Sequence, residues 1–107
     1  YTIDWQKKPV VKSRMQWVAG EAVMTAFALW DVTGETDYLD DYYNWWRYIQ
    51  ENVIDKQFGS WHHELDAAQK VTSTTWSGKP DVYHAFSACV FPILPLGASL
   101  IGSVKKL

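Results

Sequence analysis

The sequence lacks several features that mark secreted, membrane or nucleic-acid-binding proteins. Its single cysteine, Cys89, cannot form a disulfide within the chain, which agrees with a reducing compartment. A net charge of −2 provides no basic surface for nucleic acid or for an anionic membrane. The longest apolar stretches, such as 85–96, are interrupted by proline and are too short to span a bilayer. We therefore expect a cytoplasmic protein with no nucleic-acid or membrane partner.

Aromatic residues, by contrast, are abundant, with seven Trp and six Tyr among 107 residues. This usage predicts extensive aromatic packing, stacking of sugars on aromatic rings, or both. The length falls in the single-domain range, and 48% hydrophobic residues are enough to fill one core. We therefore expect a single domain over residues 1–107.

Apolar residues recur with helical spacing in two adjacent segments. Residues 13–33 are predicted as a helix, and Gly34 follows where a helix ends. Thr36 is predicted as the N-cap of a second helix over 37–53, so the two helices form an antiparallel hairpin. The apolar residues that recur in the first helix are Trp17, Val18, Ala22, Ala26, Leu29 and Val32. The second helix is predicted to bury a stripe through Leu39, Tyr42, Tyr43, Trp46, Ile49 and Val53.

The second half of the chain contains more turns. Residues 61–66 and 70–74 are predicted as short extended segments around a polar turn. A third helix is predicted from Pro80 or Asp81 to Phe91, where Pro92 ends it. A fourth helix is predicted over 96–104. The sequence thus predicts four helices with short strands between helical pairs.

A repeat links the two halves. The hairpin formed by Tyr1–Asp4 and Pro9–Val11 resembles the one formed by His63–Asp66 and Lys70-Val71, at an offset of 62 residues. A repeated hairpin with helices predicts an α-helical ring or solenoid. The second hairpin is introduced by residues 58–62, and the first copy has no counterpart to them. We therefore expect the chain to be truncated at its N-terminal end.

Three stretches in this order resemble the N-acylglucosamine 2-epimerase superfamily: 16–22, 58–66 and 76–85. The resemblance covers nearly the whole chain, and the third stretch is most similar to the aldose–ketose isomerases that act on mannose or sulfoquinovose. It implies an all-α fold, the C-terminal part of an (α/α)6 barrel with about four of the twelve helices. Gln16, where many epimerases have a second tryptophan, and Pro80, where sulfosugar isomerases can carry glutamine, are departures that bear on the substrate.

The resemblance also implies a reaction. In this family a proton moves between neighbouring sugar carbons through an enediol-like intermediate, with two histidines and no cofactor. His84 matches one of them, whereas the second catalytic histidine and a substrate-binding arginine belong to an earlier helical pair. We therefore expect aldose–ketose isomerisation of a mannose-like hexose, with this chain inactive on its own.

Histidine suits this reaction because its pKa lies near neutral pH. His84 is predicted at the third position of a helix, whose positive end disfavours the imidazolium and leaves the ring able to accept a proton. The alternative is a histidine that is hydrogen-bonded at a helix start for structural reasons. Together with the motif, the position predicts an acid/base residue.

Trp17 and Glu21 are four residues apart and therefore share one helical face. An indole can stack on a pyranose, and a carboxylate can hold sugar hydroxyls or orient a histidine. The alternative is a core tryptophan beside a solvated glutamate. His63 is a further predicted substrate contact, and Tyr83 is predicted to pack beside His84 with a possible hydroxyl contact to substrate.

The run His62-His63-Glu64 does not predict a metal site. Adjacent strand residues point to opposite faces, and no third ligand is near in the sequence. A 2-epimerase acting on N-acylglucosamine or a related sugar remains an alternative function. So do a glycoside hydrolase on an (α/α) toroid, which needs two carboxylates, and a non-catalytic helical module that binds carbohydrate or protein. Faces exposed by truncation also predict self-association.

Overall fold

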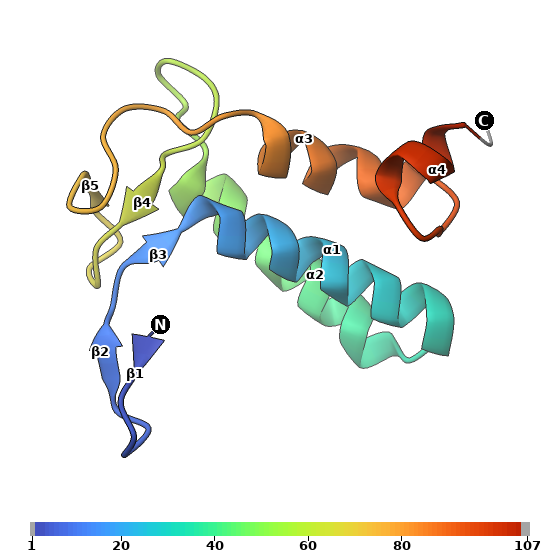
Figure 1. Cartoon of the computed structure of the whole chain (residues 1–107), viewed down its shortest axis with the longest axis horizontal. Helices are drawn as coiled ribbons and strands as arrows, with labels where there is room; N and C mark the ends of the chain where they lie inside the picture. The colour runs from blue at the N-terminus through green and yellow to red at the C-terminus, as the bar shows by residue number, and fades with distance from the viewer. Residues whose placement is uncertain (1, 106–107) are drawn as a thin grey trace.

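Three helices form the body of the protein in this computed structural model, which describes residues 2–105. Helices α1 (Gln16–Thr33) and α2 (Thr36–Tyr48) lie antiparallel, and α3 (Tyr83–Val90) packs on α1 (Figure 1). A π-helical turn η1 (Ile49–Val53) continues α2, a 3-10 turn η2 (Phe91–Ile93) continues α3, and α4 (Leu100–Val104) follows. The prediction of an all-α chain with four helices is confirmed.

The first two helices begin differently from the prediction. Helix α1 starts at Gln16 rather than near 13, because Arg14–Met15 form strand β3 instead. Thr36 is the first residue of α2, and Glu35 is its N-cap, without a side-chain capping bond. Gly34 ends α1 as predicted, at a left-handed φ of 74°, and its N–H donates to the Trp30 carbonyl at 2.7 Å.

The last two helices are shorter than predicted. Asp81 Oδ1 accepts a hydrogen bond from the Tyr83 backbone N at 2.8 Å, and α3 therefore begins at Tyr83. His84 is consequently the second residue of its helix and not the third. Pro92 does not end the helical segment at Phe91 but lies inside η2, and α4 spans only five residues.

Two hairpins, 62 residues apart, share one turn structure. Strand β1 (Thr2–Ile3) pairs with β2 (Pro9–Val11), and β4 (Glu64–Leu65) pairs with β5 (Val71–Thr72), both antiparallel. Asp4 Oδ1 accepts from the backbone N of residues 6 and 8, and Asp66 Oδ1 accepts from that of residues 68 and 70. Lys7 and Gln69 adopt left-handed φ angles of 63° and 66°. The predicted repeat is confirmed from Thr2 onward; Tyr1 lies outside the described residues.

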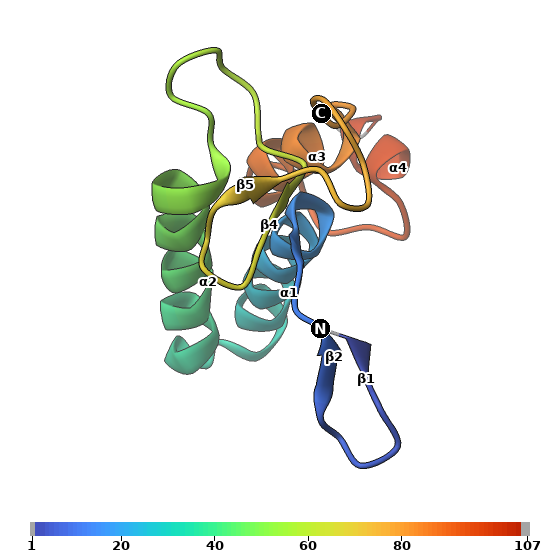
Figure 2. The same ribbon diagram turned by 90° about the vertical axis from the view of Figure 1, so that its left-hand side faces the viewer.

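The second hairpin is attached to the start of α1. Strand β3 (Arg14–Met15) pairs antiparallel with β4, giving the sheet order β3-β4-β5 (Figure 1). The Gln16 backbone N then donates to the His63 carbonyl at 3.1 Å. The first hairpin instead projects from the body (Figure 2), and Trp5 at its tip is fully exposed.

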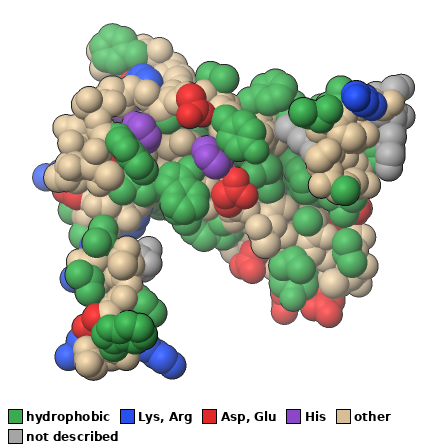
Figure 3. Space-filling view, in the orientation of Figure 1, with side chains coloured by type: hydrophobic (Ala, Val, Ile, Leu, Met, Phe, Trp, Pro, Cys, Tyr) green, Lys and Arg blue, Asp and Glu red, His purple; other side chains and the backbone are tan. Residues whose placement is uncertain are grey.

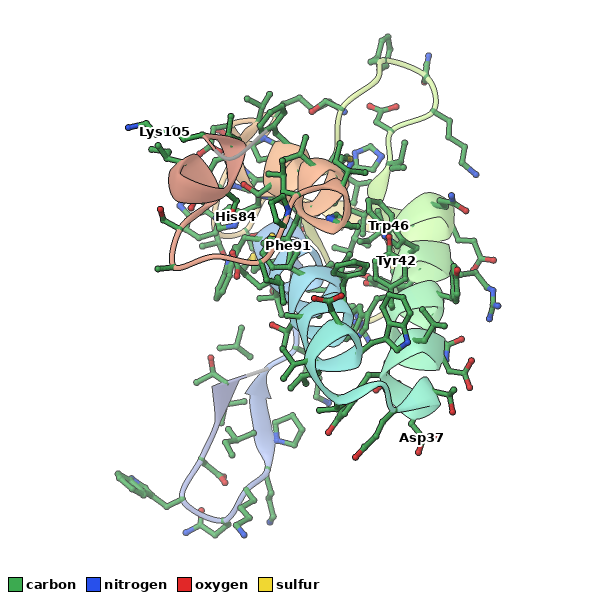
Figure 4. All side chains as sticks on the ribbon, turned by 90° about the vertical axis from the view of Figure 1, so that its right-hand side faces the viewer. Asp37, Tyr42, Trp46, His84, Phe91 and Lys105 are labelled. Carbon is green, nitrogen blue, oxygen red and sulfur yellow. The ribbon has the colours of Figure 1, made fainter. Side chains whose placement is uncertain are left out.

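The core lies between α1, α2, η1 and the second hairpin. Its buried members are Ala19, Val23, Ile49, Val53, Trp61, Leu65 and Ala88. Tyr42 and Trp46 pack against this cluster as predicted, and Tyr48 does so too; Tyr42 and Trp46 face the neighbouring elements in Figure 4. Tyr43 was predicted in the same buried stripe, but its side chain points to solvent and is exposed.

The apolar residues that recur along α1 are mostly not its buried ones. Four of the six are exposed: Trp17, Val18, Leu29 and Val32. The buried residues are instead Gln16, Ala19, Gly20, Val23 and Ala26. The small residues among these let α3 approach closely, since a Cβ on Gly20 would lie 3.3 Å from the His84 carbonyl oxygen. Within residues 2–105, no helix has the length and hydrophobicity needed to cross a bilayer.

Candidate active site

The contact between α1 and α3 brings His84 and Glu21 together. His84 Nδ1 lies 3.0 Å from Glu21 Oε1, and the two residues are 63 positions apart in the chain. With its proton on Nδ1, the imidazole donates to the carboxylate and leaves Nε2 as an acceptor. The side chains of His84 and Glu21 are 27% and 49% exposed, so Glu21 is a half-exposed carboxylate. The pair is accessible to a ligand.

Two aromatic rings border the imidazole. The Trp17 ring centroid lies 6.2 Å from that of His84, and the Tyr83 ring lies edge-on to it at 4.9 Å. Both rings are exposed at their outer sides. Trp17 and Glu21, one helical turn apart, thus meet His84 from the same face of α1. The space-filling view of Figure 3 shows histidines on one face, bordered by hydrophobic and acidic side chains.

His63 is joined to this region through the backbone. Its carbonyl accepts from Gln16, the residue before Trp17, so it lies at the start of α1. Its ring stacks on Trp76 at 4.9 Å with an interplanar angle of 20°. Trp76 is half-exposed and was not singled out from the sequence, since a loop residue has no periodic pattern. Its place in the motif 76–85 was the only signal available.

Glu64 is fully buried and has several hydrogen-bond partners. Its Oε1 accepts from Thr74 through the backbone N at 2.6 Å and through Oγ1 at 2.5 Å. Its Oε2 accepts from the Thr75 backbone N at 3.1 Å. Burial pushes the pKa of Glu64 up, but the hydrogen bonds from Thr74 and Thr75 outweigh this and the pKa is lowered. Glu64 is therefore an ionised structural carboxylate with no access to a ligand.

An ion pair holds the segment that leads into α3. Lys79 Nζ donates to Asp55 Oδ2 and, at 3.1 Å, to the Gly59 carbonyl. The hydrogen bond from Lys79 lowers the pKa of Asp55 well below its usual range, and the backbone N–H groups of residues 58 and 57 add to this against the effect of burial. The segment before His84 is thereby tied to the turn at 55–59.

A metal site finds no support in the described part of the chain. Across residues 2–105, no group of three or more His, Cys, Asp or Glu side chains is arranged to hold a metal ion. The His63 ring stacks on Trp76, and the Glu64 oxygens accept hydrogen bonds from Thr74 and Thr75 in the loop.

The helical pairs, the intervening hairpins and the histidine–carboxylate pair at a helix start define part of an α/α-barrel protein of the sugar isomerase and epimerase class. The N-acylglucosamine 2-epimerase (GlcNAc 2-epimerase) family profile matches residues 1–88, and the chain belongs to this family.

Two relatives named D-mannose isomerase match nearly the whole chain. A D-mannose isomerase from Thermobifida fusca is 47% identical over 105 residues, which cover 97% of this chain and 26% of that protein. One from Pseudomonas cannabina pv. alisalensis is 44% identical over 107 residues, 100% of this chain and 26% of that protein. The chain therefore spans about a quarter of the length of these relatives.

A solved structure supports the fold. The crystal structure of a D-mannose isomerase superposes with a TM-score of 0.76 and 23% identity, covering 87% of this chain and 24% of that one. The prediction that the chain corresponds to part of an (α/α)6 barrel is confirmed.

Proposed function

We propose that this chain supplies one of the two catalytic histidines of a sugar isomerase that interconverts a mannose-like aldose and its ketose. The observation that carries the proposal is the 3.0 Å contact between His84 Nδ1 and Glu21, which leaves Nε2 of the partly exposed ring as an acceptor. Support also comes from the two relatives, 44% and 47% identical, that are named D-mannose isomerases.

Each residue has a role in this proposal. His84 Nε2 takes a proton from the carbon next to the sugar carbonyl, the electrons of the broken C–H bond form the C=C bond of the enediol, and the carbonyl oxygen gains the proton of the neighbouring hydroxyl. The electrons of the C=C bond then take the proton back from His84 at the former carbonyl carbon, and the oxygen that lost its proton becomes the new carbonyl, which completes the aldose–ketose exchange. Glu21 orients the imidazole and stabilises its charged form. Trp17 and Tyr83 contact the sugar through their exposed rings, and His63 contacts it from the second hairpin.

The geometry argues against glycoside hydrolysis. That reaction needs two carboxylates on either side of the scissile bond. Glu21 is engaged by His84, and Glu64 is buried with its oxygens occupied by Thr74 and Thr75. Among the predicted site residues, no second carboxylate is left for an acid or a nucleophile.

A chimera tests the proposal. This chain would replace the matching C-terminal quarter of the Thermobifida fusca enzyme, with mannose as substrate in deuterated water. We expect fructose that carries solvent deuterium, and a kcat about 100- to 10,000-fold lower for His84→Gln. Cys89→Ser, an exposed position on the same helix, is the matched control and should leave kcat unchanged.

Other results of the same experiment would distinguish the alternative functions. Glucose as the first product from mannose would identify a 2-epimerase, because epimerisation returns the proton to the same carbon. Full activity in His84→Gln would refute acid/base catalysis by this residue. The 107-residue chain alone is expected to be inactive, because it carries only one of the two histidines. Its exposed apolar side chains on α1 support self-association, measurable by analytical ultracentrifugation.

A further inference from the structure

Glu64 is an ionised side chain with no exposed surface. Burying a carboxylate is unfavourable unless hydrogen bonds replace its water. Here Thr74 and Thr75, at the start of the loop between β5 and α3, provide four hydrogen bonds, two of them from the Thr75 backbone N to the two carboxylate oxygens. A buried charge satisfied by backbone N–H groups fixes the path of the loop that donates them.

The hydrogen bonds to Glu64 join the two chain segments that carry the stacked rings. His63 precedes Glu64 in the chain, and Trp76 follows Thr75. The rings of His63 and Trp76 stack with centroids 4.9 Å apart. His63 and Trp76 are therefore the chain neighbours of Glu64 and Thr75, two residues that a hydrogen bond joins. This hydrogen bond therefore helps to hold Trp76 against His63, in addition to the stack itself.

The stack is connected to the candidate active site through the backbone. The His63 carbonyl accepts from Gln16, whose neighbour Trp17 borders His84. The loop that carries Trp76 runs on to α3 and His84, and α1 and α3 start at the same side of the molecule (Figure 1). The half-exposed indole of Trp76 thus offers a second flat surface at the same end of the helices as Trp17.

We infer that Glu64 is a positioning residue: its carboxylate fixes Thr74 and Thr75 so that Trp76 stacks on His63 and forms one wall of the sugar site. This inference rests on the proposed function for its ligand, a monosaccharide. An indole held in place before binding loses less conformational entropy when a pyranose stacks on it, so Glu64 contributes to substrate affinity and not to proton transfer.

The direct test is on the full 107-residue chain. The ring current of Trp76 shifts the His63 ring protons, which histidine-labelled NMR detects, and the loss of that shift in Trp76→Ala assigns the signal. We expect Glu64→Gln to reduce the same shift, because an amide NH2 group would face the Thr75 N–H in place of an oxygen. An unchanged His63 shift in folded Glu64→Gln would overturn the inference.

Kinetics in the chimera with the Thermobifida fusca enzyme provide the second readout. Glu64→Gln and Trp76→Ala are each expected to raise the KM for mannose about 2- to 10-fold with kcat nearly unchanged. The double variant should be no worse than Trp76→Ala, because Glu64 acts through that ring. Multiplying effects on KM, or a fall in kcat alone, would show that Glu64 acts elsewhere.

Matched variants separate positioning from general stability. Glu51→Gln removes an exposed carboxylate and should change neither readout. Where Glu64→Gln does not fold, Thr74→Val removes only the Oγ1 bond, and Thr74→Ser restores it; KM should rise in the first and return in the second. An inactive unsubstituted chimera would refute the proposed function, while the NMR shift would still decide the role of Glu64.

Discussion

Gly20 controls how close α3 can come to α1, and its substitution gives a graded test of the site. A Cβ at this position would lie 3.3 Å from the His84 carbonyl oxygen and 3.5 Å from the His84 Cβ. Gly20→Ala adds only that atom, so α3 must move by a few tenths of an ångström. Alanine also favours a helix over glycine by about 1 kcal/mol, which opposes the steric cost. We expect a change in unfolding free energy below ~1 kcal/mol.

Gly20→Val adds two methyl groups to that Cβ at the same contact. Overpacking of this kind costs about 1–3 kcal/mol, and the helix that moves is the one that carries His84. Because Glu21 is the next residue on α1, a shift of α3 lengthens the 3.0 Å bond between His84 and Glu21 directly. A misplacement near 1 Å lowers kcat by about 100-fold.

The assay combines two measurements. Melting of the 107-residue chain should fall by about 4–8 °C for each kcal/mol lost, and kcat of the chimera should decrease in the order glycine, alanine, valine. Thr25→Val places the same side chain at an exposed position of α1 and serves as control. If Gly20→Val retained the kcat of the unsubstituted chimera, the close contact of the helices would have no part in holding the site.

Three further predictions concern stability. Because Lys79 lowers the pKa of Asp55, their pairing stabilises the fold above about pH 4 and is lost as the pH falls through the folded-state pKa. Lys79→Met should therefore lower the melting temperature at pH 7 and match the parent in strong acid; an equal difference at both would contradict this. Leu65→Ala, at a buried site, should lower the unfolding free energy by about 2–5 kcal/mol in urea, and a loss below 1 would refute its core role. Trp5→Ala, at the exposed hairpin tip, should change it by less than ~0.5 kcal/mol.

Local signals were enough to predict the helices and hairpins. Gly34 ends α1 in the left-handed conformation that favours glycine, and the two aspartate turns recur at the predicted offset. The buried face of α1 could not be read in this way, because large apolar residues occur on several sides of the helix. Its orientation is set by the approach of α3, and the small residues at 19, 20 and 26 were the signal for that contact.

The site was predictable where spacing within one helix sufficed. Trp17 and Glu21 share a face at any helix position, and the motif with His84 supplied the partner. Trp76 and Glu64 were missed, since their roles depend on hydrogen bonds between a strand and a loop ten residues away in the chain. The periodicity of a sequence does not show which backbone N–H groups will donate hydrogen bonds to a buried carboxylate.

The distance along the chain between Glu21 and His84 also has a consequence for folding. Helices α1 and α2 are sequence neighbours, so their contact closes a short loop and forms at low entropic cost. The His84–Glu21 contact closes a loop of 63 residues. Mild denaturant should therefore separate His84 from Glu21 while most of the helical circular dichroism of the chain persists, since a contact that closes a long loop is the more costly one to keep.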